Sequence, residues 1–172
     1  MTDAPHFAHD WDLIAAEAAD AARRRKASIE ILTERLGEIA AQAELAAWRA
    51  IAADWHWVVN HQRPAGIDDV SQLAKLTALE ESYTRCTQQL RKAQDDLPVE
   101  IRATIDGNTE TGLRYIHGDL IEPYLTAWRR RELVEAMLWW QRRTGDQSIR
   151  ILVLANIKAR QDRAPAIQGE AA

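Results

Sequence analysis

Apolar side chains recur at helical spacing through the first third of the chain. From Ile29 onward they are separated by steps of three and four residues, which places them on one face of a helix. The positions on this face are Ile29, Leu32, Leu36, Ile39, Ala43, Ala47, Ile51, Trp55 and Val58. Between Pro5 and Pro64 the chain has no proline and a single glycine, Gly37. Because helix-breaking residues are so scarce, the pattern predicts one very long helix, or two helices stacked end to end.

A second amphipathic segment follows a predicted turn near residues 62–67, where Pro64 and Gly66 occur together. Asp68 or Asp69 is the predicted N-cap of this helix, which ends near Pro98. Its apolar positions are Val70, Leu73, Leu76, Leu79, Tyr83, Cys86, Leu90, Ala93 and Leu97. A short connection between two long amphipathic helices favours an antiparallel hairpin, so we expect the second helix to lie along residues 48–59 of the first.

The rest of the chain is predicted to form shorter helices separated by glycines. Pro123 is expected to kink one helix or to begin the next. The run over residues 149–154 is rich in β-branched side chains, but no other segment offers it a sheet, so we predict a buried helix. The predicted fold is all-α: a long, coiled-coil-like antiparallel hairpin over 1–97, a C-terminal helical subdomain over 98–163 and a flexible tail over 164–172.

Composition narrows the class of protein. Of 172 residues, 47% are hydrophobic and 28% are charged, which is typical of a soluble globular domain. The apolar runs are far too short to span a bilayer and the N-terminal sequence lacks a secretory-signal pattern, so we expect a cytoplasmic protein without membrane association. The single cysteine, Cys86, excludes an intramolecular disulfide. No phosphate-loop, zinc or nucleophile-elbow motif is found, so no cofactor, metal or catalytic residue is predicted.

The C-terminal third differs in charge from the rest. Residues 111–172 hold 10 Lys/Arg against 7 Asp/Glu, although the formal net charge of the chain is -4. Tryptophan, a residue enriched at interaction hot spots, occurs there among arginines. A partner-binding surface is predicted at Trp128, Arg129, Arg130, Arg131, Trp139, Trp140, Arg142 and Arg143. Such a surface suits an acidic protein, or nucleic acid bound through residues 124–163; core tryptophans with solvated arginines are the alternative.

One stretch of this third resembles a known family. The residues from Leu133 through Leu-Trp-Trp-Gln-Arg-Arg at 138–143 to Ile151 resemble the last helices of the small helical subunit of CRISPR surveillance complexes. The resemblance implies a subunit that contacts nucleic acid and its neighbours without catalysis.

The apolar stripe of the first helix is longer than the second helix can cover. An uncovered stripe favours contact with another subunit, so self-association is predicted through Leu32, Leu36 and Ile39. We therefore expect a non-catalytic interaction or assembly subunit that forms a homo-oligomer or binds a protein partner. A nucleic-acid-associated accessory protein is the alternative. A small helical enzyme is the third hypothesis, with His56, His61 and His117 as its candidates for proton transfer.

Overall fold

A computed structural model of the chain describes residues 3–145 and 147–163, so the tail predicted over 164–172 lies outside the described residues. The all-α prediction is confirmed: within those ranges the chain forms helices and connecting turns, with no strand. In order, the elements are α1 (Trp11–Ala27), α2 (Ile29–Leu36), α3 (Glu38–Asn60), α4 (Gln72–Asp95), α5 (Val99–Arg102), α6 (Glu110–His117), the 3₁₀ helix η1 (Gly118–Ile121), α7 (Glu122–Thr144) and α8 (Ile149–Arg163).

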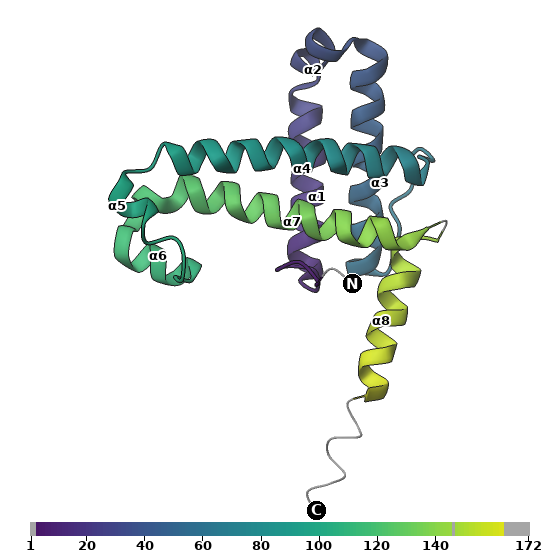
Figure 1. Cartoon of the computed structure of the whole chain (residues 1–172). Helices are drawn as coiled ribbons and strands as arrows, with labels where there is room; N and C mark the ends of the chain where they lie inside the picture. Colours follow the sequence, from purple (N-terminus) through teal and green to yellow (C-terminus); the bar gives the residue numbers. More distant parts are fainter. Residues whose placement is uncertain (1–2, 146, 164–172) are drawn as a thin grey trace, which may run out of the picture.

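The first third is not one long helix, nor two stacked end to end. The helix is interrupted at Ser28 and again at Gly37, and the chain reverses so that α3 runs back along α1 (Figure 1). Gly37 has φ +83°, a conformation that side chains with a Cβ rarely adopt. The one glycine in this long helix-forming segment therefore lies at the reversal. With α1 folded onto α3, much of the apolar stripe is covered within the same chain.

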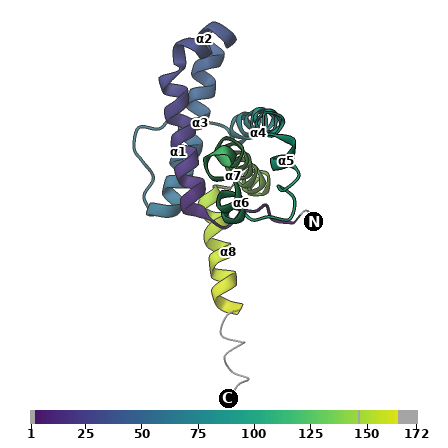
Figure 2. The same ribbon diagram turned by 90° about the vertical axis from the view of Figure 1, so that its left-hand side faces the viewer.

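Two antiparallel pairs of helices cross to form the body of the molecule. α1 packs mainly against α3, and α4 packs mainly against α7. Figures 1 and 2 show the α4–α7 pair lying across one side of the α1–α3 pair, while the end of the first pair that carries α2 projects beyond the crossing. The predicted turn at 62–67 does separate α3 from α4. These two helices cross, however, and α4 does not lie along residues 48–59 of α3 as expected.

The main hydrophobic core lies where the two pairs meet. Trp48, Ile51 and Trp55 of α3 are fully buried in it together with Leu79 of α4 and Met137 of α7. This core draws on both predicted subdomains, because α4 precedes residue 98 and α7 follows it. A second, smaller core holds the other end of the α4–α7 pair around α5, α6 and η1. Its members are Leu97, Ile101, Leu113, Ile121, Tyr124 and Leu125.

Local signals account for most helix ends. Ser71, and not Asp68 or Asp69, is the N-cap of α4: its hydroxyl accepts a hydrogen bond of 3.1 Å from the Ala74 amide, three residues on. Pro123 lies in the first turn of α7, so it begins that helix. The predicted helix at 149–154 is confirmed as the start of α8. Its burial is only partial, because Ile149 and Val153 are buried whereas Ile151 is 56% exposed.

Charged groups are also buried at the crossing. Lys75 Nζ of α4 donates a 2.6 Å hydrogen bond to Asp54 Oδ2 of α3, and both side chains are shielded from solvent. Nearer the start of α3, Glu44 accepts hydrogen bonds from Arg25 of α1 at 2.9 Å and from Arg85 of α4 at 2.8 Å. Because a buried charge is costly unless it is paired, these contacts fix which positions of α3 and α4 face each other. Across the described ranges, no helix is long and apolar enough to cross a membrane.

Candidate interaction surfaces

The N-terminal segment covers part of the predicted tryptophan surface. His6 and Phe7 pack edge-on against Trp128, with ring centroids 5.3 and 5.8 Å away. Further along α7, Trp140 Nε1 donates a 2.6 Å hydrogen bond to the Ala8 carbonyl, and only 1% of this residue is exposed. Trp140 is therefore a core residue whose polar atom is satisfied by the N-terminal segment, and its ring has no face free to stack with a base.

Trp139, its neighbour, is only partly buried. Its ring lies edge-on to Trp140, with a centroid separation of 4.9 Å, and the Arg143 guanidinium stacks 3.7 Å above it. Arg143 also donates to the Trp139 carbonyl at 2.8 Å. His9 packs against both tryptophans. One face of the Trp139 ring is thus occupied by a cation of the same helix.

The arginines of the predicted surface do not lie on one face. Arg129 and Arg130 extend towards α6 and α1, where Arg129 pairs with Glu110 at 2.7 Å and Arg130 Nε lies 3.6 Å from Glu17. Arg131 and Arg142 extend towards α4 instead: Arg131 donates to the Tyr83 hydroxyl at 2.6 Å and also pairs with Glu132 and Glu135, and Arg142 pairs with Glu80 at 3.0 Å. The structure therefore divides this set between two sides of α7, and carboxylates of the same chain neutralise much of its charge.

Burial and pairing shift the pKa values of two side chains near these arginines. Burial raises the pKa of the Cys86 thiol on α4, which is held in the main core. Hydrogen bonding from Arg114 lowers the pKa of Glu122, whose carboxylate accepts bonds of 2.5 and 3.3 Å from that guanidinium. The first shift favours the protonated thiol of Cys86, and the second favours the ionised carboxylate of Glu122.

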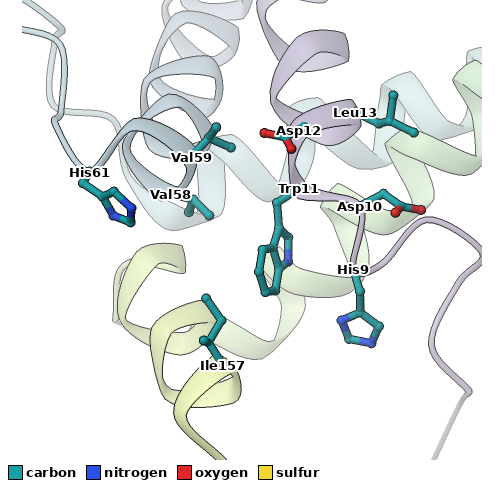
Figure 3. A pocket seen from close by; sticks show the side chains of 9 residues that line it. All are labelled: His9, Asp10, Trp11, Asp12, Leu13, Val58, Val59, His61 and Ile157. Atoms are coloured by element: carbon teal, nitrogen blue, oxygen red, sulfur yellow. The ribbon is translucent and has the colours of Figure 1, made fainter. Parts of the chain in front are cut away.

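A cavity of about 450 Å³ lies between the start of α1, the end of α3 and α8. In Figure 3 the Trp11 ring reaches from α1 towards α8, and Ile157 and His61 approach from the other side.

The three candidate histidines are held by local contacts. His56 Nδ1 lies 3.1 Å from Asn60 Nδ2, His61 is the left-handed C-cap of α3, and His117 Nε2 lies 2.7 Å from the Thr104 hydroxyl. The residues that the structure describes contain no group of three or more His, Cys, Asp or Glu side chains arranged to hold a metal ion.

The predicted self-association residues lie at the projecting end of the α1–α3 pair. We call this end the hairpin tip and define it as residues 29–41. Leu32 packs inward and is 7% exposed, whereas Leu36 is 41% and Ile39 is 89% exposed. Ile31, which the periodic pattern did not single out, is 66% exposed beside them. The structure therefore leaves two of the three predicted residues, Leu36 and Ile39, on the surface. Ile31 is a third exposed aliphatic side chain beside them.

Sequence reasoning missed a group of polar side chains around α6. Glu110, Arg114 and Glu122 connect to Arg129 through ion pairs of 2.5–2.8 Å. Arg129 belongs to the predicted partner-binding surface, but Glu110, Arg114 and Glu122 were not identified, because the contact from Glu110 to Arg129 joins two separate helices. The pair at positions 110 and 114 was the one available signal, since a separation of four residues places both side chains on one side of a helix.

Comparison of this chain with protein-family models, with curated proteins and with solved structures finds no match.

Proposed function

We propose that this chain is a non-catalytic helical assembly subunit that associates with a second copy of itself through the hairpin tip. The observation that carries the proposal is the exposure of three large aliphatic side chains, Ile31, Leu36 and Ile39, on an end of the molecule that projects from its body (Figure 1). Fully burying one such side chain contributes about 1.5–3 kcal/mol, so joint burial of the three is a substantial driving force for association.

The position of the tip favours a symmetric contact. In a two-fold dimer the same patch of both copies is buried in one interface. The total buried area is therefore twice the area of the patch on one copy. The exposed charged residues Glu30, Glu34 and Glu38 alternate with the aliphatic residues along the sequence and keep the free tip hydrated. An apolar centre with a charged rim is the usual organisation of a protein interface.

The arginines of α7 give less support to nucleic-acid binding as the main function. Arg129, Arg131 and Arg142 are each engaged by a glutamate of the same chain. A phosphate backbone would have to displace these carboxylates, and the arginines on opposite sides of α7 would not follow one strand. Binding of nucleic acid or of an acidic protein to the surface predicted over 124–163 stays a prediction.

The test is sedimentation velocity of the wild-type chain and of Ile39→Glu over a wide concentration range. We expect the wild type to show a concentration-dependent dimer and Ile39→Glu to sediment as a monomer. At a concentration where both are monomeric their melting temperatures should agree, because Ile39 is exposed in the monomer. The matched control is Leu73→Glu, which introduces the same charge at an exposed leucine, 72% accessible, on α4.

The control should associate as the wild type does. A wild-type chain that stays monomeric at every concentration, or an Ile39→Glu variant that associates as strongly as the wild type, would show that the tip is not the assembly surface. Leu32→Glu is unsuitable as the primary variant because Leu32 is buried, and its expected effect is a lower melting temperature.

A further inference from the structure

A small cavity of about 210 Å³ lies where α1, α6 and the first half of α7 meet. Three of the seven residues that line it are arginines, Arg114 of α6 and Arg129 and Arg130 of α7. The remaining walls are formed by Glu17 of α1 and by Leu125, Thr126 and Leu133 of α7. Arginines that converge on a cavity from separate helices are held in place by the fold, unlike arginines spread along one exposed surface.

The ion pairs around this cavity leave an excess of positive charge. Glu17 pairs with Arg24 at 2.5 Å and lies near Arg130, while Glu110 is shared by Arg114 and Arg129 at 2.8 and 2.7 Å. Glu122 completes the group through its 2.5 Å contact with Arg114. Four arginines are therefore connected to three glutamates. The uncompensated charge favours an anion at the cavity.

Arg130 is the least firmly paired of the three guanidinium groups. Its Nε is buried and donates no hydrogen bond to any residue that the structure describes, and its contact with Glu17, at 3.6 Å, is beyond hydrogen-bonding distance. A buried donor without an acceptor is costly, so Arg130 is held less firmly by this chain than Arg114 or Arg129 are. Thr126, whose hydroxyl is a neutral donor, lines the same cavity.

We infer that this cavity is a binding site for a phosphate group, with Arg130 as its principal ligand, Arg114 and Arg129 on its sides and Thr126 donating from α7. Guanidinium groups donate pairs of parallel hydrogen bonds to phosphate oxygens, and a tetrahedral anion offers acceptors in several directions at once. A carboxylate has two oxygens in one plane and engages fewer of these donors. The volume admits the phosphate group of a larger molecule, with the rest of that molecule remaining outside the cavity.

The experiment is isothermal titration calorimetry of the full chain with inorganic phosphate and, separately, with adenosine monophosphate, each against sodium chloride at matched ionic strength. Saturable binding is expected from at least one of the two phosphate compounds. Equal affinities would assign recognition to the phosphate group alone, and binding of the monophosphate only would assign the site to phosphate esters. Acetate should bind more weakly than either ligand.

Two variants make the assignment specific. Arg130→Gln should weaken phosphate binding about tenfold or more, because it removes charge-assisted hydrogen bonds. Glu17→Gln should strengthen binding, because it removes a carboxylate that faces the same cavity. Arg23→Gln on α1 is the matched control, since Arg23 pairs with Asp20 on the exposed side of the helix and does not line the cavity.

Absence of saturable binding by both phosphate compounds would overturn the proposal. So would binding that Arg130→Gln leaves intact, or that Arg23→Gln weakens to the same extent. The Glu17→Gln variant keeps the test decisive if Arg130→Gln does not fold, because a loss of stability cannot explain tighter binding. The outcome is independent of self-association, which is measured at the opposite end of α1.

Discussion

The two helix pairs of this protein are built from different side chains. α1 presents a buried face of Ile14, Ala18 and Ala21, and α3 contributes further buried alanines at Ala41, Ala47 and Ala50. The second pair is asymmetric: α4 buries the smaller side chains Ala78, Ser82 and Cys86 beside Leu79, whereas α7 buries larger ones, and polar pairs join the edges. The buried members of α7 include Leu133, Val134, Met137, Leu138 and Trp140.

The difference shows two ways of holding helices together. Small side chains allow backbones to approach closely, so the packing of α1 depends on the absence of bulk at Ala18 and Ala21, although α3 also buries Trp48 and Trp55 in the main core. In the α4–α7 pair the large buried side chains come from α7, with Arg131–Tyr83 and Arg142–Glu80 as additional contacts at its edges. The two pairs are joined by the buried contact of Asp54 with Lys75. Three predictions test the roles of the junction, the alanine face and the polar edge.

The largest effect is expected at the junction. Asp54→Ala leaves the Lys75 ammonium buried without its partner, and removing one member of a buried ion pair costs about 3–5 kcal/mol. Arg63, whose Nε is 3.8 Å from Asp54, loses the same carboxylate. Chemical denaturation should report this decrease in the free energy of unfolding. The matched control is the double variant Asp54→Leu with Lys75→Met, which should recover most of the loss; if it is as unstable as Asp54→Ala, the unpaired charge is not the cause.

An intermediate effect is expected on the alanine face. Ala18 is fully buried, and Ala18→Leu forces additional methylene groups between closely packed helices, at a cost of about 1–3 kcal/mol. The control is Ala16→Leu, at an exposed position on the same helix, which should leave stability nearly unchanged. Thermal denaturation of both variants distinguishes bulk at the interface from a change in helix propensity. Equal melting temperatures for the two variants would contradict close packing at Ala18.

The smallest effect is expected at the polar edge of the α4–α7 pair. Arg142 and Glu80 are both about half exposed, so Arg142→Ala should lower the free energy of unfolding by about 1 kcal/mol or less. High salt should reduce the difference between variant and wild type, because the pair is accessible to counterions. A loss several times larger that persists at high salt would show that Arg142 stabilises the pair by packing and not by charge.

Local sequence identified the helices better than their partners. The α4 segment was predicted from periodicity, since an apolar stripe at helical spacing depends only on nearby residues. The start of α8 was predicted because no other segment offers residues 149–154 a sheet. The reversal between α1 and α3 was missed because Gly37 alone was weighed against a long run of helix-forming residues. Its positive φ supplied the turn, and the burial of Ala41 beyond it shows that packing against the preceding helices stabilises the bend.

The candidate sites were predictable only in part. Leu36 and Ile39 were identified from the stripe, but Ile31 was not, because its exposure depends on how α2 packs at the tip. The tryptophans and arginines of α7 were noted from composition alone. Which of them are buried depended on the N-terminal segment: Ala8 provides the acceptor for Trp140, and the two residues are 132 positions apart.

The sequence by itself determined that this protein is helical, where most of its helices end and which side chains are available for contact, because these properties follow from propensity, capping and spacing along the chain. Tertiary structure alone decided that α1 pairs with α3 and α4 with α7, that Arg129 and Arg131 extend to different sides of α7, and that Arg130 lies beside an arginine-lined cavity. Those outcomes depend on burying apolar surface and pairing charge between residues that are distant in the sequence. The sequence of one helix does not specify which other helix will pack against it.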